Sequence, residues 1–220
     1  MRRLLGLSAL VLAVAAPLGA QAYVYPAFQP TRVAEREYNF ALVDVNIGGG
    51  GGGGTGLIFQ WREGLGNPRA QFTLDAGFAD PDAAGSDARL ILGGGFAYQM
   101  LRERQDMPFD IVFTGGVGAS FGDNVTLVRI PFGVAAGHRF PIEGKFAITP
   151  YVHPRLSIDY TSRDTRAGNV SDTKTKLNLD IDLGGSLEIN EQMQLRLALL
   201  LGDGDAIGLS FAWTPRGLRR

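Results

Sequence analysis

The chain has 220 residues, a formal net charge of −1 and no cysteine. It contains no basic run, which argues against a nucleic-acid partner, and without cysteine it forms no disulfide and carries no thiolate chemistry. Glycine is abundant, with 31 residues, and much of it falls in strand-like stretches, where it marks bends or close backbone approach.

The first 22 residues have the pattern of a secretory signal peptide. Arg2 and Arg3 precede an apolar run from Leu4 to Leu18, and residues 20–22 form a small-x-small cleavage site. The run is too short for a transmembrane helix, and no other run reaches the roughly 18 apolar residues that such a helix needs. We expect a cleaved and exported chain, although an N-terminal anchor that stays attached fits the same residues.

About ten strand-like segments follow in chain order. They cover residues 38–46, 57–62, 69–78, 89–101, 109–121, 125–140, 146–160, 174–189, 193–201 and 207–213. The alternation of apolar and polar residues shifts by one position near Leu42 and Val43, which predicts a bulge. Pro150 and Pro154 predict bulges or weak pairing. The glycine run 48–54 is expected to be a flexible loop, because no Lys-Ser/Thr follows it as in a phosphate-binding loop.

Residues 174–189 carry the clearest pattern in the chain. Leucine and isoleucine occupy one parity, and charged or polar residues occupy the other. Since successive side chains of a strand point to opposite faces, this stretch is a strand with one apolar and one charged face. It is longer than a usual globular strand and reaches the about 9–11 residues of a membrane-crossing one, which predicts a barrel wall in lipid.

Alternation alone fits both a membrane barrel and a soluble ligand-binding barrel. The polar parity is rich in glycine, serine and threonine, whereas a solvent face normally carries many lysines and glutamates. From the third segment onward the apolar parity carries no ionisable residue except His138 and tyrosines, and aromatic residues gather at its ends. These features favour lipid outside and a polar lumen inside.

The polar parity would meet in a narrow lumen. A barrel of about eight strands is just wide enough for its own side chains to fill it. Both charge signs are present, so we expect a salt-bridged plug in preference to a selective pore. The predicted lumen network consists of Arg69, Asp75, Asp110, Arg129, Arg139, His153, Arg155, Asp159, Lys176, Asp180, Asp182, Glu188 and Arg196.

Residues 38–213 resemble the small outer-membrane β-barrel proteins of Gram-negative bacteria, a family with eight to ten strands. Gly208, Phe211 and Trp213 fit the spacing of the C-terminal insertion signal of such barrels, although Ala206 stands at its polar position and the chain continues as a tail, 214–220. The resemblance implies an all-β, antiparallel, up-and-down transmembrane barrel in the outer membrane. Its partners would be outer-membrane lipid and the barrel-insertion machinery.

Two points of the architecture stay open. Ten strands are expected, but eight are possible if residues 38–62 form a plug or an extra hairpin. Residues 23–37 are expected to be an extended periplasmic segment, or else to enter the lumen. Short connectors at 63–68, 102–108, 141–145 and 190–192 are assigned to the periplasmic rim, and a second series, which includes longer loops such as 161–173, to the outer rim.

We expect no enzyme, cofactor or metal site. A lipid-modifying barrel enzyme would need a nucleophile and a base grouped at a rim, but His138 shares its strand with no serine. His153 is expected to face the lumen, near Asp159, and the pairs Asp80/Asp82 and Asp203/Asp205 offer too few ligands for calcium.

The expected role is structural, adhesive or weakly permeating. The alternatives are a narrow porin or transporter for small solutes, a lipid-modifying enzyme, and an extracellular ligand bound through the longer loops.

Overall fold

The computed structural model describes residues 25–45, 53–82, 88–122, 125–142, 146–165, 170–202 and 204–215. Its strands are β1 (Arg36–Val45), β2 (Gly54–Gly64), β3 (Ala70–Pro81), β4 (Arg89–Leu101), β5 (Asp110–Gly122), β6 (Val125–Gly137), β7 (Phe140–Pro141), β8 (Ala147–Thr165), β9 (Val170–Glu188), β10 (Met193–Leu201) and β11 (Ala206–Trp213). Within these ranges there is no helix, and so none that is long and apolar enough to cross a membrane.

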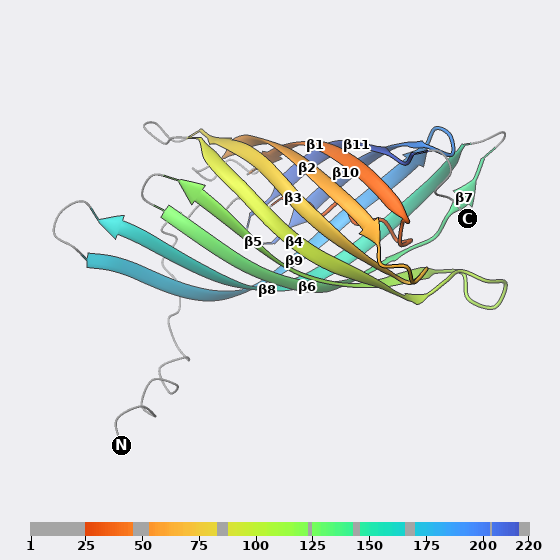
Figure 1. Ribbon diagram of the computed structural model, residues 1–220, viewed down its shortest axis with the longest axis horizontal. Helices are drawn as coiled ribbons and strands as arrows, with labels where there is room; N and C mark the ends of the chain where they lie inside the picture. The colour runs from red at the N-terminus through yellow and green to blue at the C-terminus, as the bar shows by residue number, and fades with distance from the viewer. Residues whose placement is uncertain are drawn as a thin grey trace, which may run out of the picture.

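Ten of the strands close into one antiparallel ring. Neighbours in chain order pair with one another, β6 pairs with β8, and β1 pairs with β11 to complete the circle (Figure 1). The two-residue strand β7 pairs with β8 outside this ring. The predicted ten-stranded, up-and-down barrel is confirmed. The eight-stranded alternative is wrong, because β1 and β2 are part of the wall.

The two faces of the wall are inverted relative to a soluble barrel. Leu57, Phe78 and Leu177 point outward and are 64–66% exposed, whereas Arg62 and Arg196 point inward and are 1% exposed. Leaving so much apolar surface in water would cost about 25 cal/mol per Å², but lipid removes that cost. The apolar face is therefore the lipid face, as predicted, and the soluble-barrel alternative does not fit.

The barrel has two distinct rims. At one, here called the terminal rim, β1 begins and β11 ends, and the chain passes there from β2 to β3, from β4 to β5, from β6 to β8 and from β9 to β10. At the other, the hairpin rim, β8 and β9 project beyond their neighbours, because each is 19 residues long (Figure 1).

The predicted contrast in connector length is not observed. The terminal-rim connectors 102–109 and 138–146 are as long as 46–53 and 82–88 at the hairpin rim. Most of the predicted loop 161–173 is instead paired strand, with Thr161 opposite Lys174 and Thr165 opposite Val170. Threonine and valine favour extended, paired backbone, which explains why the hairpin continues past the wall.

Local irregularities differ in part from the expected ones. β1 keeps one register against both neighbours, so the predicted bulge near Leu42 and Val43 is absent, and Val43 instead turns inward to an apolar cluster. A bulge lies in β4, between Gln99 and Leu101. The ladder between β6 and β8 skips Pro154, which has no N–H to donate, but its register does not change.

Aromatic side chains form a belt on the outer face at the terminal rim. The rings of Tyr38 and Trp213 stack at 5.6 Å, and those of Trp61 and Phe72 meet edge to face at 5.5 Å. Trp61 Nε1 also donates a hydrogen bond to Glu63, at 3.1 Å. Tyrosine and tryptophan prefer the membrane–water interface, so this belt marks where the wall leaves the hydrocarbon.

Leu197→Arg is expected to destabilise the barrel by about 2–4 kcal/mol, since Leu197 lies at the centre of β10, points outward and is 53% exposed. The control is Thr175→Arg on the projecting hairpin, which should change stability by less than about 0.5 kcal/mol. The free energy of unfolding in urea, measured in lipid vesicles by tryptophan fluorescence, checks this. Equal effects at both positions would contradict the assignment of the lipid face.

Candidate functional site

Residues 25–35 run through the lumen from the hairpin rim to the terminal rim. Tyr25 packs against an apolar cluster at the hairpin-rim ends of four strands, made up of Ala79, Ile91, Leu200 and Ala206. At the other end, the Glu35 carbonyl accepts a hydrogen bond of 2.7 Å from the Gly64 N–H, at the end of β2. Of the two alternatives for the N-terminal segment, the luminal one is observed, and the wall begins at Arg36 instead of residue 38.

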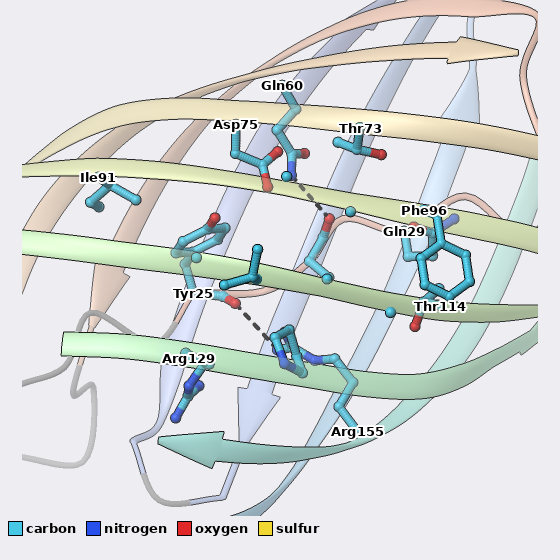
Figure 2. Close-up of a pocket in the computed structure, with 18 of the residues that line it drawn as sticks. Tyr25, Gln29, Gln60, Thr73, Asp75, Ile91, Phe96, Thr114, Arg129 and Arg155 are labelled. Carbon is cyan, nitrogen blue, oxygen red and sulfur yellow. Dashed lines mark hydrogen bonds between the residues drawn. The ribbon is translucent and has the colours of Figure 1, made fainter. Parts of the chain in front are cut away.

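Side chains of the wall satisfy the backbone of this segment. Gln99 and Gln71 accept hydrogen bonds from the N–H groups of Val33 and Ala34, at 3.0 and 2.8 Å. Further bonds join Ala27 N–H to Asp182 (3.3 Å), Arg62 to the carbonyls of Ala27 (3.2 Å) and Phe28 (3.1 Å), and Arg155 to the carbonyl of Tyr25 (3.2 Å; Figure 2). Buried backbone groups need such partners, so the lumen is built to hold this segment.

Phe28 anchors the segment. It is fully buried and has a φ of 48°, a conformation that costs a non-glycine residue about 1–3 kcal/mol unless packing enforces it. Its ring sits in an apolar cluster formed by Ala41, Val43, Ile58, Tyr151 and Ala198.

Gly208 completes this socket, because a Cβ there would lie 2.4 Å from Phe28 Cζ. Gly208 was predicted as part of the insertion signal with Phe211 and Trp213; it faces inward, while those two face outward.

A buried ion triad lies near the terminal rim and includes two residues that sequence reasoning missed. Glu37 binds Arg196 through two hydrogen bonds of 2.8 and 2.6 Å, and Arg62 through one of 2.5 Å. All three side chains are at most 3% exposed. Neither Glu37, which lies in the predicted N-terminal segment 23–37, nor Arg62 belongs to the predicted network, although Arg62 has the inward parity of its strand.

A second ion cluster lies between β6, β8 and β9. Arg129 binds both oxygens of Asp159, at 2.8 and 2.5 Å, and also Asp180 at 3.1 Å. Asn178 donates to Asp159 at 2.7 Å. Arg129, Asp159 and Asp180 of the predicted network are therefore brought together, and Arg129 forms ion pairs with both carboxylates.

Asp182 organises a third cluster, deeper in the lumen. It accepts a hydrogen bond from Arg155 at 2.8 Å and lies 3.2 Å from His153 Nδ1. The other ring nitrogen of His153 is 2.9 Å from the Thr114 hydroxyl. His153 thus contacts Asp182 and Thr114, and not Asp159 as expected from its neighbours in sequence.

Three predicted network residues lie at the terminal rim. Asp110 pairs with Arg32 of the threaded segment at 2.5 Å. Arg139 and Glu188 form a two-bond pair at 3.0 and 2.7 Å. Hydrogen bonding to Glu188 raises the pKa of the Arg139 guanidinium above its usual range, so this pair stays charged at the rim.

Two predicted network residues are exposed instead of buried in the lumen. Arg69 is exposed in the turn 65–69, before β3 begins, and its N–H bonds to Asn67. Lys176 is exposed on β9, where it lies opposite Asp159 of β8. Parity predicts which face of the strand a residue lies on, but not whether its side chain is enclosed there.

A cavity of about 130 Å³ remains beside the threaded segment. Its β4–β5 side is rich in glycine, with Gly94, Gly95, Gly115, Gly116 and Gly118. Its polar lining includes Asp75, Thr114, Arg129 and Arg155 (Figure 2). Asp75 Oδ1 is buried there without a hydrogen-bond partner. Such a space is polar enough to hold a few water molecules.

No protein-family model and no curated protein matches the sequence. Solved structures similar in fold include KdgM porin (7% identity, 82% of this chain and 99% of that chain, TM-score 0.42) and the β-domain of the Bordetella autotransporter BrkA (11%, 83% and 100%, 0.45). Neisserial surface protein A is another (14%, 80% and 92%, 0.35). The fold is that of the small outer-membrane β-barrels. This statement rests on the closed ring and its inverted faces, because likenesses this remote add no argument about function.

Glu37→Gln is expected to destabilise the barrel by about 3–5 kcal/mol, because it leaves Arg62 and Arg196 buried without their shared carboxylate. The matched control is Glu63→Gln, which breaks the partly exposed pair between Arg36 and Glu63 and should cost at most about 1 kcal/mol. Free energies of unfolding compare the two variants. If Glu37→Gln lost no more stability than Glu63→Gln, the triad would contribute little to the stability of the barrel.

Gly208→Ala is expected to cost about 1–3 kcal/mol, since its Cβ would collide with the Phe28 ring. In a Phe28→Ala background the same change should be nearly neutral. Gly185→Ala is the control, because nothing lies within 4 Å of its Cβ position. A double-mutant cycle of unfolding free energies measures the coupling; a coupling of zero would mean that Phe28 does not occupy this socket.

Proposed function

We propose that this protein is an outer-membrane barrel with a closed lumen, whose role is structural or adhesive and is carried by its outer face and rims. The single observation that supports this most is the threaded segment 25–35, bonded along its length to inward side chains. A chain that fills its own lumen in this way leaves no continuous path for solutes.

The size of the ring supports closure. Eight strands enclose about the space that their own side chains fill, so ten strands enclose more. Residues 25–35 occupy that additional space, and a cavity of about 130 Å³ lies beside them. Among the described residues, Arg129, Arg155 and Arg196 each pair with a carboxylate, so these inward charges form no ring of one sign that would select ions.

The projecting β8–β9 hairpin supports an adhesive contact. Thr173, Lys174 and Thr175 are exposed beyond the rest of the wall, where an extracellular partner would reach them first. In the orientation of outer-membrane barrels, the rim where β1 begins and β11 ends lies at the periplasmic side, so this hairpin faces the outside.

A narrow pore is the second candidate function, and the glycine-lined cavity favours it. The glycine-rich β4–β5 wall leaves a partly polar space next to the segment, and a small solute would pass there if the segment shifted.

A catalytic role has less support. His153 is buried against Asp182 and Thr114, and His138 Nδ1 lies against the Pro108 carbonyl and 3.2 Å from Glu103. Unchanged lipid A and phospholipid profiles on overexpression would agree with this.

The purified full-length protein is expected to give no reproducible unitary conductance in planar bilayers. Deletion of residues 25–34 should open steps of constant size, since it removes the segment that fills the lumen. A heat-modifiability gel controls for folding of both proteins. Unitary conductance of the intact protein would overturn the closed-lumen proposal and favour the narrow pore.

A further inference from the structure

The path of residues 25–35 has a consequence for the topology of the exported chain. In a barrel with an even number of strands, both ends of the wall lie at the same rim, and here β1 begins and β11 ends at the terminal rim. A chain that continued outward from Arg36 would leave its N-terminus on that side. The threaded segment instead returns through the lumen to the opposite rim.

The contacts of the segment follow one direction without a reversal. Arg32 binds Glu103 and Asp110 at the terminal rim. Phe28 lies between β1, β2, β8 and β10, and Tyr25 packs at the hairpin-rim ends of β3, β4, β10 and β11. Ten steps of extended chain cover up to about 33–36 Å, more than the about 25 Å apolar band of such a wall.

We infer that the N-terminal end of the exported chain is presented at the hairpin rim, on the outer surface of the membrane, beside the β8–β9 hairpin. The inference rests on the outer-membrane placement proposed above. Residues placed before Tyr25 would then be open to extracellular partners, antibodies and proteases, while residues 65–69 and 102–109 face the periplasm.

Single cysteines test this directly, because the chain has no cysteine of its own. Val24→Cys reports on the N-terminal end, Thr175→Cys on the hairpin rim and Gln105→Cys on the terminal rim; Thr175 and Gln105 are both exposed. Intact cells are treated with a bulky, membrane-impermeant maleimide, before and after permeabilisation of the outer membrane. Heat-modifiability of each variant confirms that it is folded.

Labelling of Val24→Cys and Thr175→Cys on intact cells, with Gln105→Cys labelled only after permeabilisation, is the expected result. Labelling of Thr175→Cys but not Val24→Cys on intact cells would overturn the threaded topology alone. Labelling of Gln105→Cys but not Thr175→Cys would overturn the orientation, and with it the proposed function. An epitope inserted between residues 22 and 23 gives a second readout, by antibody binding to intact cells.

Discussion

The ion triad of Glu37, Arg62 and Arg196 spans the seam where the barrel closes. Glu37 lies on β1, the first strand of the ring, and Arg196 lies on β10, 159 residues away, next to the last strand. Buried charges are tolerated only when paired, so each arginine requires the carboxylate and the carboxylate requires the closed ring. Arg62 adds a second function, because it also donates to the carbonyls of Ala27 and Phe28 and so joins the threaded segment to the wall.

The strand number and the threaded segment depend on each other. Without the segment, a ten-stranded wall would surround polar groups such as Gln71 and Gln99, which bond to Ala34 and Val33. Without the inward glycine at position 208, the ring of Phe28 would have no room. The wall and the segment are thus complementary in shape and in hydrogen bonding, which is the reason to regard residues 25–35 as part of the fold.

Much of the wall could be predicted from alternation, because a period of two assigns both strand and face. Alternation therefore predicts the luminal position of Arg129, Asp159, Asp180 and Asp182, which the structure has buried in ion clusters. Alternation does not predict how far along the barrel axis a side chain lies or which residue it pairs with, since it does not tell where a strand leaves the membrane. Lys176 has the inward parity but is exposed on β9. The role of Phe28 as a buried anchor is not predictable from the sequence pattern, because its position depends on contacts with strands far away in sequence.

The bonds of the threaded segment also bear on whether it acts as a plug that moves. Release of the segment would leave Arg62 without two carbonyl partners, Asp182 without the Ala27 N–H, and Asp110 without Arg32. Each unpaired buried group costs about 1–3 kcal/mol, and the apolar socket of Phe28 would be emptied as well. A gate needs two states of similar free energy, whereas these losses all fall on the open state. The segment is therefore better suited to permanent closure than to gating, and the same bonds hold the chain on the path that leads Tyr25 to the hairpin rim.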